Sequence, residues 1–343
     1  MGSMLYTMWI VNLFKLSFFG ILINMKKYLF IVLLVGLVSA QGPYIVETIT
    51  EEEGLRDGPQ SMNPIIYYPA DADYLKASVI LIPGFMSWIS SIEEWGPYLA
   101  SWGYVAMFVN CNWIWGSTDD RANALLDGLI TIQEENERMA SPLFNNLDLN
   151  NIAVGGWSRG GGGALKAALL DSDIKTVLAL SAWLEDITPE ELMVNAPVLF
   201  ISGELDDNAV NDIHTNVFYD YLPEGTDKLL FEVAEGTHST VTNPYNSYQT
   251  VGVAALHWLA EYLYYLPFCQ FMAEIPTTAS KYITNIDCEI LGDINNDENL
   301  NSLDVILLLG IIANSLEYES HANIDFDGRL NIFDLYHLID QVY

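Results

Sequence analysis

The chain has 343 residues, of which 51% are hydrophobic and 12% aromatic, and this composition excludes an intrinsically disordered protein. Its formal net charge of −32 disfavours nucleic acid as a partner, because phosphate groups repel an acidic surface. Its 3 cysteines are too few for a disulfide scaffold, and their spacing does not suit zinc. The length allows one large α/β domain and one small additional domain.

The N-terminal segment has the pattern of a secretory signal peptide. A positively charged start at Met25–Lys27 precedes the apolar run Tyr28–Val38, and Val38–Ala40 is a small-residue cleavage site. We therefore predict a leader over residues 1–40 whose true start is Met25, and no stable membrane anchor. The mature protein is then secreted, in a compartment where disulfides form, with tethering at the cell surface left open. The alternative is that the leader stays attached as a membrane anchor.

Strand patterns alternate with helical patterns between the leader and residue 288. Eight segments are rich in β-branched and aromatic residues, as strands are: Tyr44–Thr50, Pro64–Tyr68, Ser78–Pro83, Tyr104–Asn110, Asn151–Gly155, Thr176–Ser181, Val198–Ser202 and Leu229–Val233. Five segments have helical periodicity: Ser91–Trp102, Asp120–Met139, Arg159–Leu170, Ala209–Tyr221 and Tyr248–Tyr265. The alternation predicts an α/β fold with a mostly parallel sheet of eight or nine strands and helices on both faces.

The stretch Asn151–Leu165 has the pattern of a nucleophile elbow, in which a strand runs through a tight turn into a helix. The turn has the form Gly-x-Ser-x-Gly, with Gly156 and Gly160 at the two positions where side chains would collide. It lifts Ser158 above the sheet edge, at the start of a helix whose dipole favours a developing anion. The alternative is a serine in a glycine-rich loop, so an acid and a base must be found elsewhere in the chain.

An acidic loop follows the seventh predicted strand, where its carboxylates can reach the same sheet edge as the elbow. We predict Asp206 as the catalytic acid, with Asp207 and Glu204 as alternatives. Of the 5 histidines, only His238 lies in a loop after the last predicted strand, where the base belongs. The order Ser158, Asp206, His238 is the one that the α/β-hydrolase fold uses, and it predicts a catalytic triad.

Two backbone N–H groups are predicted to form an oxyanion hole, those of Phe85 and Arg159. Phe85 follows the third predicted strand, where the alternative is an ordinary turn, and Arg159 follows the nucleophile. Together with the triad they predict a serine ester hydrolase that needs no cofactor for catalysis. His238 would accept the proton of Ser158, and Asp206 would hold the imidazole tautomer.

Six short stretches carry a resemblance to a known family: Pro83–Phe85, Glu94–Gly103, Asp120–Ala122, Gly156–Gly163, Ala179–Trp183 and Thr237–Ser239. With them, residues 63–288 resemble the bacterial cutinase and poly(ethylene terephthalate) hydrolase group, in the dienelactone-hydrolase-like branch of α/β-hydrolases. This resemblance implies that Phe85 and Trp183 flank the bound ester. It also implies that Trp157 and Ser239 belong to the substrate site, as in the subtype that acts on aromatic polyesters.

The same resemblance implies a disulfide between Cys269 and Cys288. The chain also departs from the family, which usually has methionine after the nucleophile where this chain has Arg159. The aromatic stretch Trp113–Trp115 is unusual and forms either cleft wall or core. The segment Leu184–Ala196, between the sixth and seventh predicted strands, is too short for the helical lid of lipases. An open site of this kind suits bulky or polymeric substrates.

Two loops with a thirty-residue period follow Cys288, and an apolar helix follows each. Their oxygen-bearing side chains fall at loop positions 1, 3, 5, 9 and 12, with a main-chain carbonyl at position 7, which is the EF-hand spacing for calcium. The predicted ligands are Asp293, Asn295, Asp297, Asn299, Asn301 and Asp304 in the first loop, and Asn323, Asp325, Asp327, Arg329, Asn331 and Asp334 in the second. Position 6 is glycine in the second loop (Gly328) but Glu298 in the first.

This repeat resembles the dockerin module of type I, which implies a cohesin-type protein as partner. The pairs that would recognise it differ between the two halves, Ser302-Leu303 against Ile332-Phe333. The sequence thus predicts three parts: the leader, a catalytic α/β-hydrolase domain over residues 41–288, and a small all-α calcium-binding domain over residues 289–343.

The function predicted from these parts is hydrolysis of polyesters or other bulky carboxylic esters through an acyl-enzyme on Ser158. The main alternative is an esterase for small or carbohydrate acyl esters, held in an assembly by the dockerin-like domain. A third hypothesis is an idle hydrolase domain that serves only binding, and the complete triad argues against it.

Overall fold

The computed structural model of the protein describes residues 41–266, 268–288, 292–297, 299–314, 322, 324 and 330–342. The predicted leader and its start at Met25 lie outside these residues. The sheet and its helices belong to one unit of the chain, which begins at Tyr44. Across the described part of the chain, no helix has the length and apolar character needed to cross a membrane.

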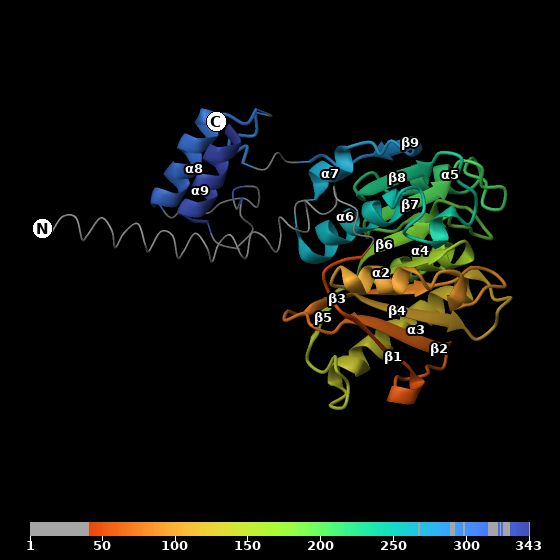
Figure 1. The fold of residues 1–343 in the computed structure, drawn as a ribbon. Coiled ribbons are helices and arrows are strands. Elements are labelled where there is room, and N and C mark those ends of the chain that lie inside the picture. Colours follow the sequence, from red (N-terminus) through yellow and green to blue (C-terminus); the bar gives the residue numbers. More distant parts are fainter. Residues whose placement is uncertain are drawn as a thin grey trace, which may run out of the picture. The chain divides into compact units, whose positions relative to one another are not determined.

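A nine-stranded sheet forms the centre of the fold, in the order β1-β2-β4-β3-β5-β6-β7-β8-β9 (Figure 1). Its strands are β1 (Val46–Ile49), β2 (Ser61–Pro69), β3 (Lys76–Ile82), β4 (Val105–Cys111), β5 (Leu147–Trp157), β6 (Ile174–Leu180), β7 (Val198–Gly203), β8 (Lys228–Val233) and β9 (Ala279–Thr284). The strands from β4 to β8 are parallel, while β1, β2 and β9 pair antiparallel at the two edges. The eight predicted strands are confirmed, and the sheet is consistent with the α/β-hydrolase fold.

The helices cover both faces of this sheet, as predicted. These helices are α2 (Trp95–Ser101), α3 (Thr118–Glu137), α4 (Arg159–Leu170), α5 (Thr215–Tyr221) and α6 (Thr250–Tyr264). Further along the chain follow α7 (Cys269–Ala273), α8 (Ser302–Asn314) and α9 (Ile332–Val342). Residues of α3, α4 and α5 pack into one core cluster, and residues of α2 and α6 into the other. Figure 1 shows the helices along the sheet.

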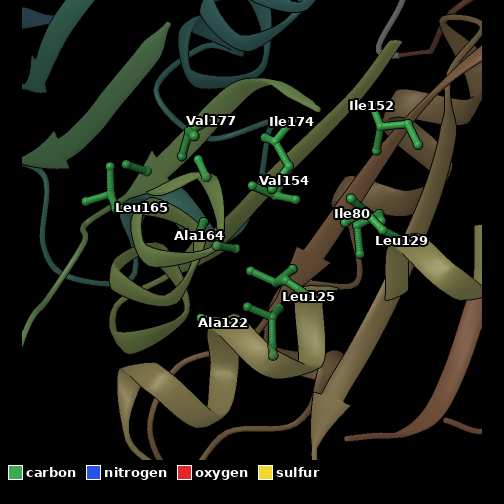
Figure 2. Packing of buried hydrophobic residues seen from close by; sticks show 14 of the residues in the cluster. Ile80, Ala122, Leu125, Leu129, Ile152, Val154, Ala164, Leu165, Ile174 and Val177 are labelled. Atoms are coloured by element: carbon green, nitrogen blue, oxygen red, sulfur yellow. The ribbon is translucent and has the colours of Figure 1, made fainter. Parts of the chain in front are cut away.

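The central strands are apolar throughout because both of their faces are covered. All seven residues of β3 are buried, and their side chains alternate between the two clusters: Ile80 and Ile82 enter one, Val79 and Leu81 the other. Figure 2 shows Ile80 beside Leu129 of α3, in the cluster that also contains Ala164 and Leu165 of α4. This packing fixes where each strand ends. The candidate site residues follow the strand ends, so the packing also fixes their positions along one edge of the sheet.

Two predicted helices are shorter than expected. In place of Ala209–Tyr221, the helix begins only at Thr215. The preceding turn is held by side chains, because Asp206 accepts a 2.8 Å hydrogen bond from the N–H of Ala209 and Asn211 donates one of 2.8 Å to Gly203. Such local bonds compete with helix formation. The other prediction, Ser91–Trp102, resolves into the 3-10 turn Ile89–Ser91 followed by α2.

The predicted disulfide between Cys269 and Cys288 is confirmed. It closes a loop with a sequence separation of 19, for which chain entropy gives about 3 kcal/mol of stabilisation. Beyond it, α8 and α9 share a separate small core formed by Leu308, Ala322, Ile324, Leu335 and Leu338. The C-terminal pair of helices therefore has apolar packing of its own.

Candidate active site

Ser158 occupies a strained turn between β5 and α4, as the elbow pattern predicts. Its backbone lies at φ 58 and ψ −123, in a region that residues other than glycine rarely adopt. A Cβ on Gly156 would lie 2.5 Å from the carbonyl carbon of Gly160, and one on Gly160 would lie 2.3 Å from the carbonyl oxygen of Ile82. Only glycine fits at both positions. The turn is further held by the N–H of Trp183, which donates to the Ser158 carbonyl at 2.9 Å.

Asp206 and His238 form a direct pair across the loops that follow β7 and β8. The Nδ1 atom of His238 lies 2.8 Å from Oδ2 of Asp206, whose side chain is completely buried. The other oxygen of Asp206 accepts hydrogen bonds from the N–H groups of Asn208 and Ala209. Burial would raise the pKa of Asp206, but the hydrogen bonds from His238 and the backbone outweigh it and lower that pKa below its ordinary value.

The two alternative acids have other partners. Glu204 accepts a hydrogen bond from the N–H of Glu235 at 2.8 Å, and Asp207 accepts one from the side chain of Asn208 at 2.8 Å. Among the three carboxylates that the sequence left open, the structure brings Asp206 to the histidine.

His238 is held beside the elbow through Trp157, the residue before Ser158. The indole Nε1 of Trp157 donates to the carbonyl of His238 at 2.8 Å, and the two ring centroids are 5.1 Å apart. Within the described residues, the Ser158 hydroxyl and the His238 ring make no direct hydrogen bond. Catalytic contacts of this kind often tighten only when substrate binds. Ser239, also predicted in the site, is exposed.

The loop after β3 packs directly on the nucleophile. A Cβ on Gly84 would lie 2.9 Å from the Cβ of Ser158, so the backbone of this loop approaches the serine as closely as it can. Across the described part of the chain, the N–H groups of Phe85 and Arg159 have no hydrogen-bond acceptor. In contrast, the N–H of Met86 donates to the carbonyl of Ile114 at 3.0 Å. The N–H of the residue after Ser158 and one N–H of the loop that packs on it therefore remain available as donors.

Arg121 holds the loop after β3 in place, a role that the sequence did not predict. Its side chain is 1% exposed and donates to the carbonyls of Pro83 at 3.1 Å, Gly84 at 2.7 Å and Ile114 at 3.4 Å. Burial lowers the pKa of this guanidinium from its very high ordinary value, and the carbonyl dipoles around it stabilise the charged form. The motif Asp120–Ala122 contains this residue, but a sequence pattern does not predict which backbone carbonyls its side chain will contact.

An aromatic wall lies beside the elbow. The ring of Phe85 meets that of Trp115 edge-on at 5.5 Å, and both rings are exposed, so Trp115 does not lie in the core. Trp183 is half-buried, with its ring centroid 5.7 Å from that of His214. His214, which falls within the predicted helix Ala209–Tyr221 and lies directly before α5, is buried, and burial lowers its pKa below the ordinary value. Its ring is therefore neutral near pH 7 and serves to support Trp183.

The first calcium-type loop and the end of the second lie within the described residues. Oδ1 and Oδ2 of Asp304 each accept a 2.9 Å hydrogen bond from backbone N–H groups at loop positions 2 and 9. Asp334 repeats the pattern at 2.7 Å, and both carboxylates are completely buried. The remaining predicted ligands of the second loop, Asn323, Asp325, Asp327 and Arg329, lie outside the described residues. Within the described part, no group of three or more His, Cys, Asp or Glu side chains converges as a metal site.

Comparison with known proteins shows a family match and several related enzymes. Residues 36–287 match the model of the PET hydrolase-like family. A cutinase of Thermobifida alba is 30% identical over 233 residues, which are 66% of this chain and 73% of that protein. A lipase of Moraxella sp. is 32% identical over 203 residues, or 58% of this chain and 59% of the lipase. A bis(hydroxyethyl) terephthalate hydrolase of Streptomyces coelicolor is 31% identical over 200 residues, or 58% of this chain and 61% of that enzyme.

The fold and these relatives define a carboxylic ester hydrolase. Within that class the chain belongs to the PET hydrolase-like family, which confirms the resemblance to the cutinase and poly(ethylene terephthalate) hydrolase group. The family match ends at residue 287 and leaves the C-terminal pair of helices outside it.

Proposed function

We propose that the protein hydrolyses esters through an acyl-enzyme on Ser158. His238 takes the Ser158 proton as the hydroxyl attacks the ester carbonyl, and it then protonates the leaving alcohol. Asp206 holds the imidazole and stabilises its charged form, while the N–H groups of Phe85 and Arg159 bind the oxyanion. Water activated by His238 then releases the acid. The observation that carries this proposal is the 2.8 Å pair of His238 and Asp206, held beside the strained Ser158 turn.

The proposed substrates are polyesters or other bulky carboxylic esters. Two observations, both independent of the triad, support this substrate class. The segment between β6 and β7 contains only the short 3-10 turn Glu190–Leu192, so it builds no helical lid. On the loop that packs on the nucleophile, Phe85 is 37% exposed, and Trp115, in contact with its ring, is 49% exposed. Exposed apolar surface of this kind suits an extended, poorly soluble substrate.

The test is hydrolysis of p-nitrophenyl butyrate by the full chain and by Ser158→Ala. We expect the variant to lose at least about 10³-fold in kcat, because the covalent route disappears. Ser90→Ala is the matched control, since Ser90 is exposed and outside the proposed site, and it should keep wild-type activity. Activity retained in Ser158→Ala would exclude the proposed nucleophile. Release of soluble product from polyester film would then establish the polymer as a substrate.

We also propose that residues 289–343 form a dockerin-like domain that binds calcium and a cohesin-type partner. The repeated capping of Asp304 and Asp334 supports two equivalent loops, and their oxygen donors suit a hard cation. The ion would be held by the predicted loop oxygens and would supply only structural cross-linking. Exposed apolar side chains on α8 and α9, such as Ile306 at 63% and Tyr336 at 55%, provide surface for a partner. With the leader, this proposal includes secretion.

A carbohydrate acyl ester is the second proposed substrate class. The C-terminal repeat favours it, because relatives of that module often accompany polysaccharide-degrading enzymes. Comparing product release from acetylated or feruloylated xylan with release from polyester film separates the two substrate classes. Faster release from xylan, normalised to the rate on p-nitrophenyl butyrate, would replace the polyester proposal.

A further inference from the structure

Arg159 makes contacts that the family's usual methionine cannot make. The central carbon of its guanidinium lies 4.1 Å from the ring centroid of Phe85 and 4.6 Å from that of Trp183. These are the two aromatic side chains expected to flank the bound ester. Only 22% of the Arg159 side chain is exposed, and cation–π contacts strengthen as solvent is removed. The guanidinium therefore lies against the ring surfaces on which a flat acyl group would stack.

Further contacts fix the orientation of this guanidinium. Its Nη1 donates to the carbonyl of Gly116 at 3.3 Å, and its Nε lies 3.7 Å from Oε1 of Glu185. Glu185 is itself held at the start of α3, where it accepts a hydrogen bond from the N–H of Thr118 at 3.1 Å. A group that displaces the guanidinium must break the two ring contacts, the hydrogen bond and the ion pair together.

We propose that Arg159 determines acyl specificity: it blocks the aromatic acyl subsite, so the enzyme prefers esters of aliphatic acids to esters of aromatic acids. This inference rests on the proposed function, because it concerns the acyl group attached to Ser158. An aryl acyl group must compete with the cation for the faces of Phe85 and Trp183. An aliphatic chain needs no ring face and packs on ring edges and on the methylene stem of Arg159.

The experiment compares p-nitrophenyl benzoate with p-nitrophenyl butyrate, which share one leaving group and differ only in the acyl part. The quantity measured is the ratio of their kcat/KM values, benzoate over butyrate. In Arg159→Met we expect this ratio to rise about tenfold, a change of about 1.4 kcal/mol, which is the size of the cation–π interaction that the substitution removes. Arg159→Lys keeps the charge without the planar guanidinium, and the ratio should rise by a smaller factor.

Lys166→Met is the matched control. Lys166 lies on the same helix, and its removal also deletes one positive charge, but it pairs with Asp119 and Glu191. The ratio should stay within about twofold of wild type in this variant. An unchanged ratio in both Arg159 variants, or an equal rise in Lys166→Met, would overturn the proposal.

Binding of neutral amides gives a second readout that needs no turnover. Calorimetric titration with benzamide and butyramide should show the preference for benzamide rising about tenfold in Arg159→Met. An unchanged preference would also overturn the proposal. If wild type hydrolyses neither nitrophenyl ester, the proposed function fails, whereas the amide titration still decides whether Arg159 blocks the aromatic subsite.

Discussion

At the scale of single residues, Asp206 shows how hydrogen bonds keep a buried carboxylate ionised. Its side chain is fully buried, yet three hydrogen bonds to its oxygens lower its pKa. We expect Asp206→Asn to lose about 10⁴-fold in kcat on p-nitrophenyl butyrate, because the wrong histidine tautomer is then favoured. Asp207→Asn is the control and should stay within about twofold of wild type. Equal losses in the two variants would contradict the assignment of Asp206.

The lowered pKa of Asp206 also determines how this residue makes the stability of the fold depend on pH. A carboxyl whose pKa is lower in the folded chain than in the unfolded chain stabilises the fold at every pH above its unfolded value, about 3.9 for aspartate. That contribution is lost only as the pH falls below this value toward the lowered folded pKa. Asp206 therefore gives no reason for instability between pH 5 and pH 8.

Residue patterns predicted the triad because its signals are local. A Gly-x-Ser-x-Gly turn, an acidic loop after one strand and a histidine loop after another each fit within ten residues, and the fold supplies their order. Arg121 and His214 were beyond such reasoning. Their partners, the loop carbonyls at Pro83 and Gly84 and the ring of Trp183, come from other elements, so only the packed fold reveals them.

At the scale of elements, the position of the loop after β3, which carries the proposed oxyanion donor Phe85, depends on Arg121. Arg121→Met would remove the donor of the Pro83 carbonyl and would leave the Gly84 carbonyl only the 3.3 Å bond from the N–H of Ser87. We expect it to cost about 3 kcal/mol of unfolding free energy and at least tenfold in kcat on p-nitrophenyl butyrate, with a smaller change in KM. Denaturant unfolding and steady-state kinetics measure the two effects.

Arg56→Met is the control for that prediction. Arg56 pairs with Asp127 at 2.8 Å, through contacts that involve none of the proposed catalytic residues. It should lower stability without lowering kcat. A kcat loss in Arg56→Met as large as that in Arg121→Met would show that stability alone, and not the position of the loop after β3, controls the rate.

The contact between α6 and the segment around α7 should depend on pH. His257 stacks with Phe268 and Phe271, and burial lowers its pKa to about 4. Below about pH 6.5 the unfolded chain takes up this proton more readily than the folded chain, so stability falls as the pH drops from about 6.5 to about 4. The loss is at most about 3 kcal/mol, and His257→Leu should make the melting temperature less sensitive to pH in this window. Identical pH profiles for the variant and wild type would contradict it.

Element boundaries were harder to predict than element types. The β9 strand escaped the sequence analysis because its residues are only half-buried or exposed, so no apolar alternation marks it. The late start of α5 has the opposite origin, since Asp206 and Asn211 use their side chains to hold the backbone in a turn. Tertiary pairing with β8 therefore sets the bounds of β9, whereas side-chain hydrogen bonds within one loop set the start of α5.

At the scale of the whole molecule, the chain combines a large excess of negative charge with a large core around the sheet and a separate small core at α8 and α9. The chain carries 45 acidic against 13 basic residues, and repulsion among the acidic groups opposes compaction. The sheet buries two large apolar clusters that outweigh this repulsion, whereas among the described residues the core of α8 and α9 has five buried side chains. The C-terminal pair of helices is therefore the part whose stability should respond most to bound cations.

Calcium should stabilise the C-terminal pair without affecting catalysis. At a calcium concentration a hundredfold above the dissociation constant, binding adds about 2.7 kcal/mol to the folded state. Calorimetry of the full chain should show one transition that calcium raises and EGTA lowers, while kcat on p-nitrophenyl butyrate stays constant. Asp334→Ala removes a predicted ligand and the cap of its loop, and should reduce the calcium response. Identical transitions in calcium and EGTA would exclude the calcium sites, and a kcat that falls with EGTA would show that the metal serves catalysis.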